Sequence, residues 1–194
     1  MKQQKKLMNQ LYHHHFDHTD GNIELAQKYN AKIVCNIKDK HRIKGAEIFI
    51  EDGGKFELGD SVAKIIDVSA HTQGHILYYF EKDKALFTGD TLFNLCIGGL
   101  FEGTPKQMFE ALSKIRSLPD DVLFYPGNEY TFSAANFAYH HNQANDNIIK
   151  YLTKAKSNLD TTGHVFPISL GEEKLIEFIK PVGLYKNKSK HILE

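Results

Sequence analysis

Residues 13–18 read His13-His14-His15-Phe16-Asp17-His18, a run of histidines broken by one aromatic and one acidic residue. The pattern His-x-His-x-Asp-His holds three imidazoles and a carboxylate at positions that no single face of a helix or strand presents together. A loop that turns back around a metal ion would present all four, and these side chains suit zinc, iron or manganese. A solvated histidine run or a purification-tag remnant is the competing interpretation, but Phe16 and Asp17 interrupt the run.

The composition is that of an ordinary globular protein. The chain has 194 residues, of which 41% are hydrophobic and 25% charged, and this suits one domain or one domain with a small appendage. The formal net charge is zero, so we expect neither a nucleic acid nor a membrane as a partner. Only two cysteines are present, and no apolar segment follows the basic start, which together favour a cytoplasmic location.

Short apolar runs alternate with amphipathic stretches, which is typical of an α/β protein. Single strands are predicted at residues 32–35, 61–68 and 121–125. Hairpins are predicted at residues 47–58, around Asp52-Gly53-Gly54, and at residues 76–88, around Lys82-Asp83-Lys84. The strand that should lead into His13 is expected to be weak, because Asn9 and Gln10 interrupt its apolar run.

Helices are predicted from capping residues and from apolar spacing. Thr104 followed by Pro105 is a favoured helix start, and apolar residues then recur at intervals of three and four, which predicts one buried stripe. That stripe consists of Met108, Phe109, Leu112 and Ile115. Further helices are predicted over residues 23–29 with Asn22 as the cap, over residues 131–159, and near residues 172–178.

Two other segments carry candidate metal ligands. His71 follows a predicted strand and is the better ligand of its segment, whereas His75 is expected to support the ligands or to pack. Asp90 follows Gly89 at the end of another predicted strand. A Gly-Asp pair is often only a turn, but a carboxylate at a strand end can also bridge two metals. Beside the histidines, we favour Asp90 as a ligand.

Six segments together resemble the hydroxyacylglutathione hydrolases, the glyoxalase II branch of the metallo-β-lactamase superfamily. They occur in the family's order and are residues 13–22, 70–75, 86–93, 101–104, 117–131 and 164–174. The resemblance implies an α/β (α+β) fold, a metallo-β-lactamase-like αββα sandwich that lacks its first strands. It also implies a division into residues 1–130, the metallo-β-lactamase-like domain, and residues 131–194, a C-terminal helical part that binds substrate.

The same resemblance implies the roles of individual residues. His13, His15 and His71 would hold a first metal, Asp17 and His18 a second, and Asp90 would bridge the two. Asp17 and Asp90 would be catalytic, and Tyr130 and Phe101 would bind substrate. The metal implied is commonly zinc, with iron and manganese as alternatives.

Three departures from the family pattern change these expectations. Asn128 stands where the family has its last histidine ligand, and a neutral amide oxygen is a weak zinc ligand, so one firmly held zinc is expected and the second is in question. Gly99 stands where the family usually has a basic residue that anchors glutathione, and Phe101 replaces a common tyrosine. Missing first strands would leave an exposed sheet edge, through which we expect self-association.

The function implied is hydrolysis of S-(2-hydroxyacyl)glutathione thioesters, for example S-lactoylglutathione to lactate and glutathione, as in methylglyoxal detoxification. The departures lead us to expect reduced activity. Two alternatives stay open. One is an enzyme similar to the persulfide dioxygenases with a single iron, which Asn128 favours. The other is a non-catalytic, degenerate relative or fragment.

Overall fold

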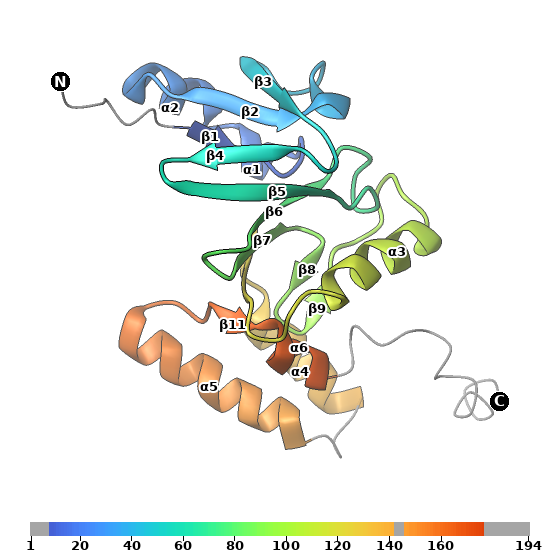
Figure 1. Cartoon of the computed structure of the whole chain (residues 1–194). Coiled ribbons are helices and arrows are strands. Elements are labelled where there is room, and N and C mark those ends of the chain that lie inside the picture. The colour runs from blue at the N-terminus through green and yellow to red at the C-terminus, as the bar shows by residue number, and fades with distance from the viewer. Residues whose placement is uncertain (1–7, 142–145, 177–194) are drawn as a thin grey trace.

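Two β-sheets packed face to face form the centre of the molecule, and helices cover their outer faces (Figure 1). The structure is a computed structural model that describes residues 8–141 and 146–176. The smaller sheet is parallel, with strand order β1-β2-β3. Its strands are β1 (Met8–Gln10), β2 (Lys32–Asn36) and β3 (Ala46–Ile50).

The larger sheet has six strands in the order β11-β10-β7-β6-β5-β4. They are β4 (Lys55–Leu58), β5 (Ser61–Asp67), β6 (Ile76–Phe80), β7 (Ala85–Gly89), β10 (Leu123–Pro126) and β11 (Ile168–Ser169). Neighbouring strands are antiparallel except β7 and β10, which are parallel. A separate short hairpin pairs β8 (Leu92–Phe93) with β9 (Cys96–Ile97).

The helices are divided between the two outer faces (Figure 1). They are α1 (Phe16–Thr19), α2 (Asn22–Tyr29), the 3-10 turn η1 (Ile37–Asp39), α3 (Pro105–Arg116), α4 (Thr131–His141), α5 (Asp146–Thr162) and α6 (Leu170–Leu175). Helix α2 packs Ala26 against the smaller sheet, while α3 to α6 share one core with the larger sheet. This arrangement confirms the predicted αββα sandwich.

Strand β6 shows how the sequence builds these layers. All five of its residues are buried, because both faces of the larger sheet are covered. Leu77 and Tyr79 face the helices, whereas Tyr78 packs between the two sheets with Phe56 and Val34. This alternation is the two-residue period of a strand.

One predicted hairpin is wrong. The strands on either side of Asp52-Gly53-Gly54 do not pair with each other, because β3 pairs with β2 and β4 pairs with β5. Ile48 of β3 and Phe56 of β4 pack into the same core from opposite sheets. The glycine turn therefore carries the chain from one sheet to the other. The second predicted hairpin, β6 with β7, is confirmed.

The helix predictions need smaller corrections. The capping box of Thr104 with Gln107 is present at α3, but Phe109 is 41% exposed, and Ala111 takes its place in the buried stripe. Helix α2 begins one residue early, with Gly21 as its cap, because the chain leaves α1 already in a helical conformation. The predicted helix over 131–159 is two helices, with residues 142–145 outside the described ranges, and the one near 172–178 is α6.

The leading strand is present but short, as its sequence predicts. Strand β1 has three residues and occupies one edge of the smaller sheet. Self-association at such an edge, the absence of earlier strands and the division near residue 130 all stay predictions. Among the described residues, no helix has the length and apolar character needed to cross a membrane.

Candidate metal centre

The predicted ligands come together at one edge of the sandwich. Strands β5, β7 and β10 run in the same direction, so the residues that follow them meet at one edge of the larger sheet. His71 follows β5, Asp90 follows β7 and Asn128 follows β10, while the segment that begins at His13 follows β1 of the other sheet. The direction of these strands therefore brings candidate ligands that are distant in sequence together in one site.

A first cluster consists of His13, His15, His71 and Asp90. Each offers one ligand atom, and these atoms all lie within 4.8 Å of one another. The Oδ2 atom of Asp90 is 3.6 Å from Nε2 of His71 and 3.9 Å from Nε2 of His13. Three imidazoles and one carboxylate form a donor set that suits zinc.

A second cluster consists of Asp17, His18 and Asp90. The Nε2 atom of His18 lies 3.2 Å from Oδ1 of Asp90 and 3.3 Å from Oδ2 of Asp17. The two oxygens of Asp90 therefore face different clusters, which is the arrangement of a bridging carboxylate.

The buried polar atoms of these clusters fit a metal. Nδ1 and Nε2 of His13, Nε2 of His18 and Oδ1 of Asp90 are buried without a hydrogen-bond partner, which is rare for polar atoms unless something else satisfies them. Burial, reinforced by the neighbouring imidazoles, lowers the pKa of His13 and of His15. Both rings are therefore neutral near pH 7, the form that binds a metal.

The pKa of His18 shifts in the opposite direction from those of His13 and His15. Burial lowers it, but the nearby carboxylates of Asp90 and Asp17 outweigh burial and raise it. The two carboxylates beside this ring thus favour its protonated form.

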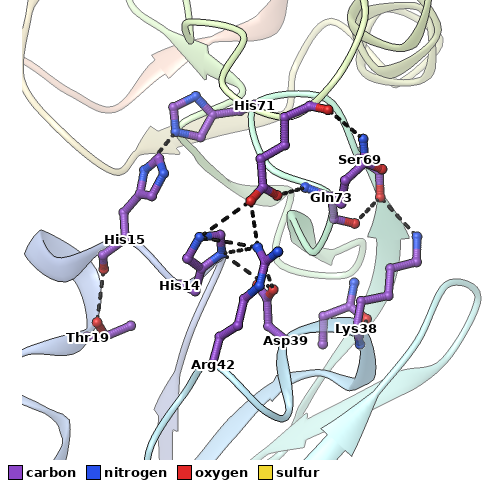
Figure 2. Close-up of polar contacts among 11 residues, drawn as sticks. His14, His15, Thr19, Lys38, Asp39, Arg42, Ser69, His71 and Gln73 are labelled. Carbon is purple, nitrogen blue, oxygen red and sulfur yellow. Dashed lines mark hydrogen bonds and ion pairs between the residues drawn. The ribbon is translucent and has the colours of Figure 1, made fainter.

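The backbone around the site orients the rings. Nδ1 of His71 lies 2.8 Å from the carbonyl oxygen of Gly99, so this nitrogen donates its proton and Nε2 is left for a metal. His15 is the N-cap residue of α1, and Thr19 Oγ1 donates to the His15 carbonyl oxygen at 3.0 Å. Figure 2 shows the rings of His15 and His71 facing each other, with the Thr19 hydroxyl at the His15 carbonyl.

His75 supports the ligands and belongs to neither cluster. It is fully buried, and its Nε2 accepts a hydrogen bond from the backbone N–H of Asp90 at 3.0 Å. Its ring stacks on His13 with 4.8 Å between centroids. Burial holds the pKa of His75 well below its usual value, so it acts as a neutral acceptor that positions Asp90.

Two glycines let the backbone approach the ligands. Gly89 has φ +49°, and a Cβ there would lie 2.8 Å from His75 and from Tyr12. A Cβ on Gly98 would lie 1.7 Å from the carbonyl oxygen of Asp90. Side chains at these positions would displace the segments that carry Asp90 and His71.

Asn128 lies beside the second cluster. Its Nδ2 donates to Oδ2 of Asp17 at 3.2 Å, while its Oδ1 is buried without a hydrogen-bond partner. Burial raises the pKa of Asp17, but the hydrogen bond from Asn128 and the nearby His18 lower it overall. Asn128 is thus in direct contact with the second cluster.

The two predicted substrate residues have different surroundings. Phe101 is 71% exposed, and its ring lies edge to face with His15 and His71, at centroid distances of 5.2 Å and 5.1 Å. Tyr130 packs on Phe93 and lines an open, largely apolar cavity of about 380 Å³. The other lining residues are Leu95, Cys96, Ile97, Ser133, Ala134 and Phe137.

Sequence reasoning missed a polar network under the ligand loops. Arg42 contacts His14, Asp39 and Glu102 (Figure 2). Glu102 belongs to residues 101–104, one of the segments that resemble the family, but its position in the sequence does not indicate a function. Asp39 and Arg42 lie in a polar stretch with no motif, and their partners are distant in sequence.

Comparison with known proteins identifies the family of this chain. Residues 13–127 match the family model described as the metallo-beta-lactamase superfamily. The hydroxyacylglutathione hydrolase of Pelagibacter ubique is 37% identical over 178 residues, which cover 92% of this chain and 74% of that protein. The enzyme of the same name from Methylococcus capsulatus is 44% identical over 126 residues, which cover 65% of this chain and 49% of that protein.

Solved structures show the same fold. The BLEG-1 B3 metallo-beta-lactamase superposes with a TM-score of 0.60 at 23% identity, over 66% of this chain and 72% of that one. ETHE1 from Myxococcus xanthus superposes with a TM-score of 0.57 at 25% identity, over 64% of this chain and 54% of that one.

Proposed function

The chain belongs to the metallo-beta-lactamase superfamily, and on that premise we propose that it is a metal-dependent hydrolase of S-(2-hydroxyacyl)glutathione thioesters. S-lactoylglutathione, hydrolysed to lactate and glutathione, is the substrate we favour. The observation that carries this proposal is the pair of clusters that share Asp90, with the exposed ring of Phe101 against the first of them. The relatives named hydroxyacylglutathione hydrolase support the choice of thioester.

We propose zinc as the metal, with iron and manganese as alternatives. His13, His15 and His71 would hold one ion with Asp90, and the donor set of Asp17, His18 and Asp90 would hold a second ion only weakly. When bound, such a metal supplies hydroxide near neutral pH and polarises a thioester carbonyl.

Residues of the chain would activate the attacking water and fix the position of the metal that polarises the thioester. The lowered pKa of Asp17 keeps it a carboxylate at neutral pH, so it can accept a proton from water. Asp90 is held by the hydrogen bond from its backbone to His75 and so presents its oxygens in fixed directions. A thiolate is a tolerable leaving group, so the site needs no strong general acid.

Phe101 and Tyr130 would receive the substrate. The exposed ring of Phe101 stands against the first cluster and would pack on the acyl part of the thioester. Tyr130 and its apolar cavity would receive apolar parts of the substrate beyond the reacting carbon. A role in methylglyoxal detoxification in the cytoplasm follows from this substrate.

Hydrolysis of S-lactoylglutathione by zinc-loaded protein, followed by the free thiol released, tests the proposal. We expect turnover that His71→Ala and Asp90→Asn each lower at least a hundredfold. Asp121→Asn, which removes an exposed carboxylate paired with Lys84, is the control and should leave turnover unchanged. Folded, zinc-loaded protein without thioester turnover would contradict the proposal.

One rival is favoured by a particular residue. Asn128 beside Asp17 weakens the second cluster, which suits a single iron and persulfide oxidation. Oxygen consumption by iron-loaded protein with glutathione persulfide would support this rival. Metal binding without either activity would identify a non-catalytic relative.

A further inference from the structure

We propose that Arg42 and Glu102 form a positioning pair that holds the two histidine loops of the metal centre at the separation that metal binding requires. One loop follows β1 and carries His13 and His15. The other follows β5 and carries His71. The loops come from different sheets, and the backbone hydrogen bond from Ile76 N–H to the Tyr12 carbonyl oxygen, at 3.1 Å, joins them only where the first loop begins and the second ends. This inference rests on the metal centre of the proposed function.

Glu102 is fixed to the loop of His71. Its Oε2 accepts the backbone N–H of Gln73 at 2.7 Å, and its carbonyl oxygen accepts Nε2 of Gln73 at 3.0 Å. Burial raises the pKa of Glu102, but the hydrogen bonds from Gln73 and Arg42 lower it overall and keep it a carboxylate. Phe101, the preceding residue, donates its backbone N–H to the His71 carbonyl oxygen at 3.2 Å.

Arg42 connects Glu102 to the other loop. Its Nη1 donates to Oε1 of Glu102 at 2.6 Å and lies 3.2 Å and 3.3 Å from the two ring nitrogens of His14. His14 stands between the two metal-facing histidines of the β1 loop. Figure 2 shows the guanidinium group of Arg42 beside the His14 ring. One cation therefore joins both loops.

The buried carboxylate of Asp39 contacts both His14 and Arg42. It is 1% exposed, and its Oδ1 lies 3.4 Å from Nδ1 of His14 and 3.8 Å from Nη1 of Arg42. It also lies directly under Gly74, where an added Cβ would be 2.3 Å from the carboxyl group. Gly74, in the loop that carries His71, thus packs closely on Asp39, the same carboxylate that contacts His14.

The ligand atoms need such a constraint because a metal removes the contact between them. Nε2 of His71 and Nδ1 of His15 lie 3.2 Å apart. With His71 protonated at Nδ1, its Nε2 can accept a hydrogen bond from Nδ1 of His15, and a metal bound to both nitrogens would replace this hydrogen bond. Partners outside the ligand set supply this order at other metal centres, and their loss weakens metal binding about 10- to 100-fold.

The ordinary interpretation is a surface ion pair. The side chains of Arg42 and Glu102 are 36% and 25% exposed, and such pairs add little to stability. The two interpretations differ in what they predict. A surface pair affects neither folding nor metal binding appreciably, whereas a positioning pair affects metal binding much more than folding.

Measurements of zinc affinity distinguish the surface ion pair from the positioning pair. We would measure zinc dissociation constants by competition with a chromophoric chelator for wild type, Arg42→Met and Glu102→Gln, and for the double variant. We expect each single variant to bind zinc about 10- to 100-fold more weakly. The double variant should lose no more than either single one, because both changes break the same connection. The melting temperature of the metal-free proteins should stay nearly unchanged.

Glu81→Gln is the matched control. Glu81 pairs with Lys64 at 2.6 Å, the same distance as in the Arg42–Glu102 pair, but on the larger sheet and outside the network. It should leave zinc affinity unchanged. Arg42→Lys retains the charge but not the reach to both carboxylate and imidazole, so partial recovery of affinity is expected relative to Arg42→Met.

Three results would overturn the inference. They are zinc affinity within twofold of wild type in both single variants, an equal loss in Glu81→Gln, or a loss of affinity matched by a large fall in the melting temperature. Failure of the proposed function would look different, because wild type would then bind zinc without hydrolysing thioesters. Wild type that binds no zinc would overturn both.

Discussion

At the scale of single residues, Asp90 has the central place in the site. Its two oxygens face different clusters, and its backbone N–H is held by His75. The neighbouring Asn128 donates a hydrogen bond to Asp17 of the second cluster. The ligands were predictable because metal binding restricts residue types and spacing. The supporting Arg42 and Asp39 were not, because their spacing in the sequence carries no such restriction.

Asn128→His should raise the metal content from about one to about two ions per chain after mild chelation. The asparagine lies 3.2 Å from Asp17, and an imidazole there would replace a weak amide ligand with a strong one. Elemental analysis measures the change. Asn158→His on α5 is the control for a histidine added elsewhere. A second ion that already resists chelation in wild type would contradict the assignment.

Gly99→Lys should lower KM for S-lactoylglutathione about fivefold with little change in kcat, since an exposed charge pair contributes about 1 kcal/mol. The backbone carbonyl of Gly99 would still accept from His71, and the Phe101 ring, 3.3 Å from an added Cβ, is exposed and free to shift. Steady-state kinetics compare it with Gly99→Ala, which adds no charge. Equal KM values in both variants would place the anchor elsewhere.

At the scale of elements, the sequence predicted those helices and hairpins that depend on residues close together in the chain. The capping box of Thr104 and the hairpin of β6 with β7 formed as expected, because each depends on residues close in sequence. The turn at Gly53 was misjudged, because the choice between pairing β3 with β4 and separating them depends on β2 and β5. That choice is made by tertiary packing, which a turn motif does not report.

Gly89→Ala should destabilise the protein by roughly 2–5 kcal/mol, the sum of a left-handed backbone and an overpacked site. Gly89 has φ +49° and no space for a Cβ next to His75 and Tyr12. Gly53→Ala is the matched control, with φ +72° and nothing within 4 Å of its Cβ, so roughly 1–2 kcal/mol is expected. Chemical denaturation of the metal-free proteins measures both. Equal losses would show that the site end of β7 is not tightly packed.

At the scale of the whole molecule, Glu173 joins elements that are distant in sequence. This residue of α6 is fully buried and accepts hydrogen bonds from the backbone of Leu95 at 3.1 Å and from the hydroxyl of Tyr151 on α5 at 3.0 Å. It therefore fixes helices α5 and α6 to the segment after β8, beside the cavity of Tyr130. Burial raises the pKa of Glu173 to about 7, although both hydrogen bonds oppose the rise.

Glu173 should make the metal-free protein less stable as the pH rises from 5 to 8. The folded state holds this proton more tightly than the unfolded chain does. The contribution is therefore complete below 4.5, the ordinary pKa of a glutamate, and is lost by about pH 7. The change amounts to roughly 3 kcal/mol. Glu173→Gln should remove it, so the difference between the two unfolding free energies should grow with pH. A difference that is constant with pH would contradict the raised pKa.

Turnover measured against added zinc tests the central claim most directly. Metal-free protein would receive stepwise equivalents of zinc, and the hydrolysis of S-lactoylglutathione would be followed after each addition. We predict turnover that rises in proportion to zinc, reaches a plateau near one equivalent per chain and disappears on chelation. Folded protein that binds this zinc yet hydrolyses no S-lactoylglutathione at any stoichiometry would contradict it.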